Sequence, residues 1–360
     1  MPSPTDRRSR DVPAWTGMPA TKLAEEAATW RELNRRHADS PLLDPDFLLP
    51  AISRFGSGEE RLCLAHDDEG PVAGAIVARA RPGVWNTFQP SQAPIGPLVL
   101  ARPGSAAAAL WSLQRSVSRS CLLLGITQQD PDLSPRPGDG GRWRTMDYIE
   151  TSRVTVDGSF DDYWGQRGKN LRQNLRRQRN RLRREETTTR LHLEEDPAAM
   201  AEAVRDYAAL ETRSWKAREG TAVREDDAQG RFYRSVLEGF GRRRAAHVYR
   251  YFYGDRLAAM DLCISQGGAI VILKTTYDES IQGTSPAMLM REEAFRQIFA
   301  ERRFRRIEFY GRVMDWHRRW TTEMRVMYHL EIARWRWLAA IRRRSSGRPS
   351  RRATEAPPAA

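Results

Sequence analysis

LKTTYDESIQGTSPAMLM (residues 273–290) joins the end of a strand to the start of a helix through a turn that contains glycine. We expect Ser285 to be the N-cap of this helix and Pro286 its first residue, because both residue types are favoured at those positions. A helix start presents free backbone N–H groups and the positive end of the helix dipole, which together bind phosphate groups. Gly283 lets such a group approach the backbone closely. The stretch therefore predicts a phosphate cradle or, as the alternative, a well-capped helix without a ligand.

Three strands precede this helix. Residues 245–279 divide into three strands at two tight turns, which contain the sequences GD and QGG. Hydrophobic periodicity predicts the other elements of the second half of the chain. They are a basic helix at 161–186, a strand at 190–195, helices at 197–218, 231–243 and 284–303, a strand at 305–311, a short helix at 315–320 and a strand at 327–335.

The first half of the chain predicts a similar mixture of helices and strands. We expect helices at 21–38, 45–55 and 105–117, strands at 60–68, 71–82 and 121–128, and a proline-rich loop at 81–98. Residues 142–158 alternate in the way that strands do, and we expect them to carry the chain into a second structural unit.

The order of elements in the second half, β-α-α-β-β-β-α-β-α-β, is the order of the GNAT acyltransferase fold. Residues 160–335 resemble the CelD-type acetyltransferases, which are linked to bacterial cellulose and exopolysaccharide biosynthesis and are related to the FemAB aminoacyltransferases. The segments that carry the resemblance are YWGQRGKNLRQNLRRQRNRL (163–182), ETRSWKAREG (211–220), RFYRSVLEGF (231–240), LKTTYDESIQGTSPAMLM (273–290) and EFYGRVMDWHRRWT (308–321).

The resemblance extends over about residues 25–335, because TWRELNRRHADSPLLDPDFL (29–48) is similar to the start of the same family. The sequence departs from the family pattern at three places. Ala287 stands where the family usually has glycine, Glu308 where it favours aspartate, and Trp316 with His317 where it favours a Tyr-Lys pair.

FemAB relatives carry two GNAT-like units in tandem. The resemblance therefore implies an α/β (α+β) protein with tandem GNAT-like domains, in which helices flank mixed central sheets. A chain of 360 residues suits two domains. We expect a flexible N-terminus at 1–20, an N-terminal GNAT-like domain at 21–150, a C-terminal acyltransferase domain at 151–338 and a disordered basic tail at 339–360.

The resemblance implies acetyl-CoA or another acyl-CoA as the donor. Its diphosphate would lie at the start of the helix that begins near residue 285, where we expect the amides of Ala287 and Met288 to lack helical partners. The residues expected to bind the donor are Gly283, Thr284, Ser285, Ala287 and Met288. Pro286 removes one N–H donor from this cradle.

In the fold that the resemblance implies, the thioester lies where the strand LKTTYD and the strand IEFYG separate. An acceptor attacks the carbonyl directly, and a backbone N–H stabilises the oxyanion. Asp278 or Glu308 would deprotonate the acceptor, and Tyr310 would protonate the leaving thiolate. Lys274 would steady Asp278 or contact the substrate. The alternative for Asp278 is a turn in which its side chain caps the backbone.

Aromatic residues are candidates for the acceptor pocket, because aromatic faces stack on sugar rings. The residues expected to contact the acceptor are Trp215, Lys216, Tyr277, Trp316, His317 and Trp320. The alternative for the tryptophans is packing in the core.

The chain has a net charge of +13, which permits nucleic acid, anionic lipid or phosphorylated small molecules as partners. The basic stretch at 167–186 has one thin apolar stripe, formed by Leu171, Leu175 and Leu182, and arginines on its other faces. Three alternatives remain open for this stretch: a solvated helix, a surface that faces phosphates, and an RNA surface.

Three further features bear on the class of protein. Cys63, Cys121 and Cys263 are isolated among apolar neighbours, so we expect buried thiols. The six histidines lack metal-ligand spacing, and we expect no metal. No apolar run approaches the roughly 18 residues of a membrane span, and the N-terminus lacks the apolar core of a signal peptide. We therefore expect a cytoplasmic protein.

The leading hypothesis is an acyl-CoA-dependent N- or O-acyltransferase that acts on a small molecule or glycan precursor. One alternative takes its acyl group from aminoacyl-tRNA, as FemAB relatives do. The other is a non-catalytic protein on a decayed GNAT fold that binds RNA or an anionic surface.

Overall fold

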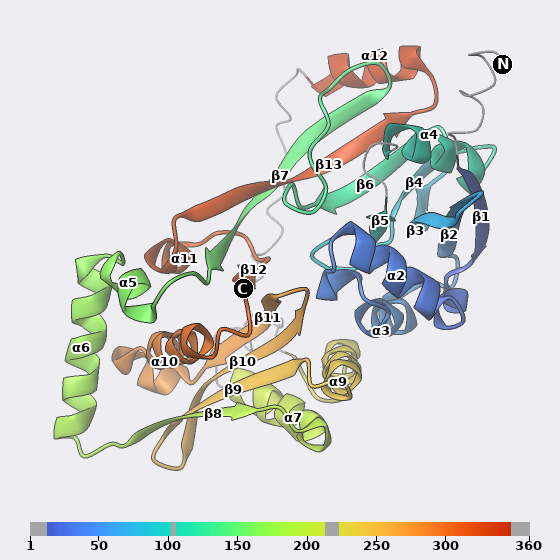
Figure 1. Cartoon of the computed structure of the whole chain (residues 1–360). Helices are drawn as coiled ribbons and strands as arrows, with labels where there is room; N and C mark the ends of the chain where they lie inside the picture. The colour runs from blue at the N-terminus through green and yellow to red at the C-terminus, as the bar shows by residue number, and fades with distance from the viewer. Residues whose placement is uncertain (1–12, 102–105, 213–222, 347–360) are drawn as a thin grey trace. The chain divides into compact units, whose positions relative to one another are not determined.

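The fold comes from a computed structural model, which describes residues 13–101, 106–212 and 223–346. The chain forms two compact units (Figure 1). Unit 1 comprises the residues up to Glu150 together with those from Arg325 onward, and unit 2 comprises Thr151–Met324. The two boundaries fall inside strands β7 (Trp143–Thr155) and β13 (Glu323–Ala333), so each of these strands has residues in both units.

Unit 1 has a mixed sheet with the strand order β1-β2-β3-β4-β6-β13, and β5 pairs with β3. Its elements are β1 (Ala14–Pro19), η1 (Ala20–Ala24), α2 (Ala27–His37), η2 (Pro41–Leu43), α3 (Pro45–Phe55), β2 (Arg61–Asp67), β3 (Gly70–Arg81), β4 (Val84–Thr87), β5 (Leu98–Leu100), α4 (Ala106–Val117), β6 (Leu123–Gln129) and α12 (Arg336–Ser346). Strands β4 and β6 are parallel, whereas β6 and β13 are antiparallel.

Unit 2 has the strand order β7-β12-β11-β10-β9-β8. Its elements are α5 (Phe160–Gly165), α6 (Lys169–Arg184), β8 (Thr189–Glu194), η4 (Pro197–Ala199), α7 (Met200–Glu211), α9 (Ala228–Gly241), β9 (Ala246–Tyr253), β10 (Arg256–Gln266), β11 (Ala269–Tyr277), η5 (Glu279–Thr284), α10 (Pro286–Glu301), β12 (Arg306–Phe309) and α11 (Asp315–Trp320). Strands β11 and β12 are parallel, and the other pairs in this sheet are antiparallel.

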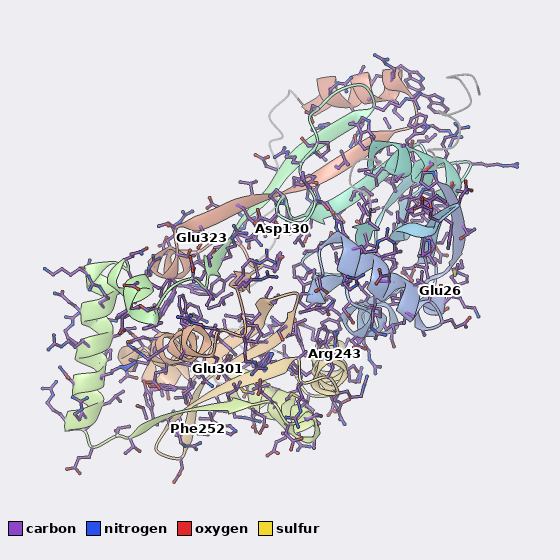
Figure 2. All side chains as sticks on the ribbon, viewed as in Figure 1. Glu26, Asp130, Arg243, Phe252, Glu301 and Glu323 are labelled. Carbon is purple, nitrogen blue, oxygen red and sulfur yellow. The ribbon has the colours of Figure 1, made fainter. Side chains whose placement is uncertain are left out.

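Helices cover both faces of the sheet in unit 2 (Figure 1). Strand β10 is buried at every residue from Ala258 to Ser265, because α10 packs on one face and α7 with α9 packs on the other. Buried aromatic and aliphatic side chains of α10, which ends at Glu301 (labelled in Figure 2), fill the space between this helix and the strands. This packing fixes β11, the strand that precedes the predicted cradle.

Helix α6 carries the basic stretch. Its three leucines are buried in the same cluster as Leu289 and Met290 of α10, and its arginines lie on the other faces, as the sequence predicted. Arg179 forms ion pairs with Glu292 at 3.0 Å and with Glu293 at 3.4 Å. The buried leucines and these ion pairs therefore hold α6 against α10, and most of the charge of α6 stays in water.

The structure differs from several sequence predictions. Residues 14–19 form β1 rather than a flexible end, because they pair with β2 in register. Helix α12 includes residues 339–346, which were expected to be disordered; Ala339 is buried against the sheet of unit 1. The basic helix predicted at 161–186 is two helices, which Gly168, the N-cap of α6, separates. The predicted loop at 81–98 contains β4.

The domain boundary also differs. Unit 2 begins at Thr151, and β13 from Arg325 onward with α12 belongs to unit 1 rather than to the expected second domain, because β13 pairs with β6. The three cysteines are buried as expected, and burial raises the pKa of Cys63 to about 12 and that of Cys121 to about 11. Within the described residues, no helix combines the length and the apolar character that crossing a membrane requires.

Candidate active site

The parallel strands β11 and β12 separate partway along their length. Their register begins at Ala269 and Arg306 and ends at Ile272 and Phe309. Strand β11 continues to Tyr277 in pairing with β10, whereas β12 ends at Phe309 and the chain turns into α11. The structure thus shows the separation that was expected between LKTTYD and IEFYG.

A β-bulge marks the point of separation. Leu262 of β10 pairs with Lys274, but the next residue, Cys263, pairs with Ile272, so Leu273 is the extra residue on β11. A bulge leaves its extra residue outside the regular ladder and redirects the side chains beside it. Bulges are common beside active sites for this reason. Leu273 thus offers backbone groups at the point where β11 leaves β12.

Residue Thr275 holds β11 in place beyond the bulge. Its carbonyl accepts a hydrogen bond from the Tyr207 hydroxyl of α7 at 3.1 Å, and its hydroxyl accepts one from Nη2 of Arg291 at 3.2 Å. Tyr207 also donates to Glu211, a fully buried carboxylate, at 2.9 Å. Helices on both faces of the sheet therefore fix the free part of β11.

Arg291 connects β11 to α11. Its buried guanidinium forms an ion pair with Asp261 of β10 at 3.3 Å and lies 4.5 Å from the ring centroid of Trp316. Nε of Arg291 and Oδ1 of Asp261 are buried without a hydrogen-bond partner. The pair is long for a charge-assisted hydrogen bond, and the arginine divides its contacts between the strand and the aromatic residue. Arg291 thereby places Trp316 next to the separated strands.

The imidazole of His317 stacks on the half-buried ring of Trp316, with 3.5 Å between the ring centroids. Burial, and then the positive charge of Arg291, lower the pKa of His317 to about 3. The ring is therefore neutral near pH 7. Its Nδ1 accepts a hydrogen bond from the Met314 amide at 3.0 Å, so the proton of the neutral ring is on Nε2. His317 can donate a hydrogen bond from that atom.

Asp278 caps the backbone, which is the alternative that the sequence left open. Its carboxylate accepts hydrogen bonds from the Ser280 amide at 3.0 Å and from Nη2 of Arg256 at 2.6 Å. Burial alone would raise the pKa of Asp278, but the hydrogen bonds from Arg256 and Ser280 outweigh it, and the pKa is lowered. A carboxylate held in its charged form by such donors is a weak proton acceptor.

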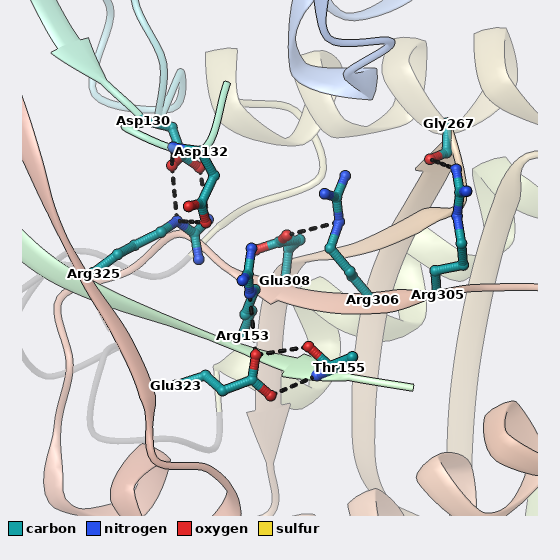
Figure 3. Close-up of polar contacts among 10 residues, drawn as sticks. All are labelled: Asp130, Asp132, Arg153, Thr155, Gly267, Arg305, Arg306, Glu308, Glu323 and Arg325. Atoms are coloured by element: carbon teal, nitrogen blue, oxygen red, sulfur yellow. Dashed lines mark hydrogen bonds and ion pairs between the residues drawn. The ribbon is translucent and has the colours of Figure 1, made fainter. Parts of the chain in front are cut away.

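The other candidate catalytic residues lie beside the separation. Glu308 is buried on β12 and forms an ion pair with Arg306 at 3.4 Å (Figure 3). Tyr310 is buried and directly follows β12, which ends at Phe309. The ammonium of Lys274 lies 5.7 Å from the ring centroid of Tyr233, so this side chain reaches toward α9.

The predicted cradle has fewer available backbone N–H donors than expected. Ser285 is the N-cap and Pro286 the first residue of α10, as predicted, but the Ser285 side chain makes no capping hydrogen bond. Ser285 has a left-handed backbone with φ of 55°, so its carbonyl accepts the amide of Met288 at 3.0 Å. The expectation that the Met288 amide is available is therefore wrong. Gly283 lies beside α6, because a Cβ there would be 3.9 Å from Nη1 of Arg181.

The remaining residues of the predicted site have different surroundings. The hydroxyl of Thr284 donates to the Ile281 carbonyl at 2.7 Å, and Ala287 and Tyr277 pack against the core of unit 2. Trp320 is fully buried, so the structure places it in the core rather than where a sugar could stack. Trp215 and Lys216 lie outside the described residues.

Sequence reasoning missed three charged residues near the separation: Asp261, Arg291 and Glu211. Each interrupts an apolar pattern. Asp261 is in the run AAMDLCI of β10, and Arg291 and Glu211 occupy helix positions whose neighbours one turn away are buried. A charged residue at a core position needs a buried partner. The interruption of an apolar pattern by a charged residue is visible in the sequence and could have identified these three residues.

These elements lie within a segment that is similar to a known domain family. Residues 169–345 match the family described as acetyltransferase (GNAT) domain. No curated protein sequence matches the chain. The matched residues include the separated strands, α10 and α11, so the geometry described above lies within the GNAT domain match.

Solved structures share the fold. FemX superposes with a TM-score of 0.58 at 9% identity, covering 91% of this chain and 99% of FemX. The C-terminal domain (DUF2156) of a putative lysylphosphatidylglycerol synthetase from Agrobacterium fabrum gives 0.54 at 12%, with 90% and 96% covered. L-PGS from Bacillus licheniformis gives 0.51 at 13%, with 89% and 97% covered. The predicted fold class, GNAT-like with mixed sheets flanked by helices, is confirmed.

Proposed function

We propose that the chain is an acyltransferase that moves an acyl group from acyl-CoA to an amine or hydroxyl at the separation of β11 and β12. The observation that carries the proposal is the parallel pair that ends at Ile272 and Phe309 beside a bulge, within the matched GNAT domain. A gap between two strands of one sheet admits an extended thioester chain, and the bulge directs a backbone group toward it.

The donor's diphosphate would lie at the start of α10. The Ala287 amide is in the first turn of this helix, where the helix dipole favours negative charge. Gly283 permits close approach, and the guanidinium of Arg181 lies beside it. Nη1 of Arg181 would add a charged donor in place of the Met288 amide, while Nε of Arg181 stays paired with Glu185 at 2.8 Å.

The proton transfers would use residues of β12 and the loop after it. Glu308 would accept the proton of the acceptor as its nitrogen or oxygen bonds to the carbonyl carbon. The N–H of Leu273 would stabilise the oxyanion. The carbon–sulfur bond would then break, and Tyr310 would donate a proton to the thiolate. We prefer Glu308 to Asp278, because the capping hydrogen bonds of Asp278 hold its charged form.

The acceptor would meet the partly exposed ring of Trp316 and the Nε2–H of His317. An aromatic face beside a hydrogen-bond donor suits a sugar that carries an amine or hydroxyl. A glycan precursor, as in the CelD-type enzymes that the sequence resembles, is therefore the acceptor class that we favour, with acetyl as the acyl group.

Aminoacyl-tRNA is a second candidate donor, which the exposed arginines of α6 favour. Arg172, Arg176 and Arg183 are exposed along a helix that lies beside Gly283, and arginines so placed can bind an RNA backbone. The same feature would remain on a non-catalytic binding protein.

The test is release of free thiol from acetyl-CoA in the presence of amino sugars and simple amines. We expect release that depends on the acceptor and falls in the Glu308→Gln and Tyr310→Phe variants. Transfer from charged tRNA without thiol release from any acyl-CoA would favour the second donor. No transfer from either donor by folded protein would contradict an enzymatic function.

A further inference from the structure

Large apolar side chains are exposed around α12 in unit 1. Trp335 is 41% exposed, Trp337 59% and Ile341 53%, and Leu122, at 38%, is adjacent because its carbonyl accepts the Arg334 amide at 2.8 Å. Over the described residues, these are four of seven large hydrophobic residues that are exposed. Their clustering within one unit distinguishes them from isolated surface residues.

The position of α12 forces this exposure. Leu338 and Ala339 pack against Leu123 and Ala333, and Arg342 forms an ion pair with Glu331 of β13 at 2.7 Å. These contacts fix one side of the helix on the sheet of unit 1. Trp337 and Ile341 are one turn apart and lie on the other side, where the ring of Trp335 stacks on that of Trp337 at 5.6 Å. The helix is therefore held with an apolar face toward water.

Cations surround this face. Nη1 of Arg142 donates to the Arg334 carbonyl at 2.9 Å, and Nη1 of Arg343 donates to the Gly141 carbonyl at 3.3 Å. These acceptors are neutral, and Arg142 also lies 3.5 Å from the ring centroid of Trp111, so none of these contacts pairs a guanidinium with an acid. Burial, and then the charges of Arg336 and Arg115, lower the pKa of Arg142, as expected where cations lie close together.

The α12 surface, defined as Leu122, Trp335, Trp337 and Ile341 with Arg336 and Arg343, combines two kinds of group. Tryptophan and aliphatic side chains enter the boundary between lipid headgroups and acyl chains, and arginines beside them bind headgroup phosphates. A nucleic acid would use the stacked tryptophans but would leave Leu122 and Ile341 without a partner.

We propose that the α12 surface binds the face of an anionic lipid bilayer, and that the chain associates with membranes through it without spanning them. The sequence adds charge of the same sign next to this helix, since Arg348, Arg351 and Arg352 follow it with Glu355 as the one acid of 347–360. The proposal does not depend on acyl transfer, because the α12 surface belongs to unit 1 and the candidate active site to unit 2.

The test is flotation of the full chain with vesicles of phosphatidylglycerol and phosphatidylcholine in equal parts, compared with vesicles of phosphatidylcholine alone. We expect binding to the anionic vesicles only. Trp337→Ser combined with Ile341→Ser should weaken it about tenfold or more, because exposed apolar groups contribute to interfacial binding. Arg336→Ser combined with Arg343→Ser should have a similar effect.

Arg176→Ser combined with Arg177→Ser is the matched control, because it removes two exposed arginines from α6. We expect it to change binding by less than about twofold, since those arginines lie outside the α12 surface. All the substituted residues are exposed, and circular dichroism would check that each variant folds. Three results would overturn the proposal: no vesicle binding, equal loss in the α6 control, or binding of single-stranded RNA or of a second copy of the chain through α12 in place of lipid.

Discussion

Among the described residues, each unit contains one pair of parallel strands, and the two pairs end differently. In unit 2, β11 and β12 separate after Ile272 and Phe309, and the bulge is on β11 itself. In unit 1, β4 and β6 remain connected beyond their last register pair. The hydroxyls of Thr87 and Thr127 are 2.6 Å apart, and the Thr127 amide donates to Thr87 at 2.9 Å.

Side chains and the following loop fill the same region of unit 1. A Cβ on Gly125 would be 2.3 Å from Oδ1 of Asn86, so the asparagine occupies the space between the strands. Gln129 donates to the Gly96 carbonyl at 3.1 Å, which fixes the loop after β4 to β6. A shared strand arrangement therefore does not imply a shared site. Only where the pair opens can a linear substrate pass between the strands.

The largest effects should come from the buried Arg–Asp pairs, one in each unit. Arg325→Met should lower the free energy of unfolding by about 3–5 kcal/mol, because it removes the cation that binds both oxygens of the buried Asp130 carboxylate. In the structure, Arg325 binds both oxygens of Asp130, at 2.7 and 2.8 Å (Figure 3). Arg291→Met should cost less stability, because its pair with Asp261 is longer, but it should abolish acyl transfer. Urea unfolding and thiol release measure the two effects.

The matched control for this comparison is Arg291→Met combined with Asp261→Asn. It removes both charges and should recover stability but not transfer. Full transfer by either Arg291 variant would contradict the role that we assign to Arg291 in connecting β11 to Trp316.

Substitutions at Glu308 and Asp278 test which of the two carboxylates accepts the proton. Glu308→Gln should lower the rate of transfer about 100-fold, in the range typical of a lost general base. Asp278→Asn should leave the rate nearly unchanged, because asparagine can still cap the Ser280 amide. It should cost about 1 kcal/mol or less of stability, since Arg256 is half exposed and solvent screens the ion pair. The opposite pattern of rates would make Asp278 the base.

Two histidines with strongly lowered pKa values predict a dependence of stability on pH. Burial lowers the pKa of His37 in unit 1 to about 4, and burial with Arg291 lowers that of His317 to about 3. The unfolded chain binds protons at these residues near pH 6.5, whereas the folded rings stay neutral. Stability should therefore fall as the pH falls below about 6.5, by up to about 1.4 kcal/mol per pH unit for each ring.

His37→Gln and His317→Asn should each reduce that slope, as urea unfolding between pH 7 and about pH 4.5 would show. Gln keeps the position of Nε2, which contacts Ser134, and Asn keeps that of Nδ1, which accepts from Met314. Only His317→Asn should also slow transfer, because it removes the Nε2–H donor. An unchanged slope in both variants would show that the folded rings are protonated.

The smallest effects should come from the threonines. Thr87→Val removes the connection between β4 and β6, and Thr275→Val removes the hydroxyl that Arg291 binds. Each should cost about 1 kcal/mol, as one neutral hydrogen bond does. Thermal unfolding measures this cost. Transfer should persist in the unit 1 variant and fall in the unit 2 variant; equal transfer in both would weaken the distinction between the two strand pairs.

Much of the fold could be predicted because its signals are local. Helices α3 and α11 have the bounds that hydrophobic periodicity indicated, and the meander of β9, β10 and β11 follows from its tight turns. Strand β1 and helix α12 could not be predicted in this way. Their residues look like chain ends in the sequence, and long-range partners, β2 and the sheet of unit 1, order them.

The site was less predictable, for a related reason. The separation of β11 and β12 was expected from the resemblance, but the role of Asp278 depends on Arg256, 22 residues away, which the register of β10 and β11 brings within 2.6 Å. Sequence spacing alone cannot show that contact. The available Met288 amide was predicted from helix geometry, and the left-handed Ser285 overrode it.

The central claim is that unit 2 binds an acyl-CoA at the start of α10, beside the separated strands. Calorimetric titration of acetyl-CoA and longer acyl-CoAs tests it, with Ser285→Glu and Ser285→Asn as a pair. Asparagine tolerates the left-handed backbone of Ser285, so it controls for strain, whereas glutamate adds a negative charge where the diphosphate would lie. We predict micromolar binding by the natural chain and by Ser285→Asn, and none by Ser285→Glu. Absence of binding by the natural chain, or equal binding by Ser285→Glu, would contradict the claim.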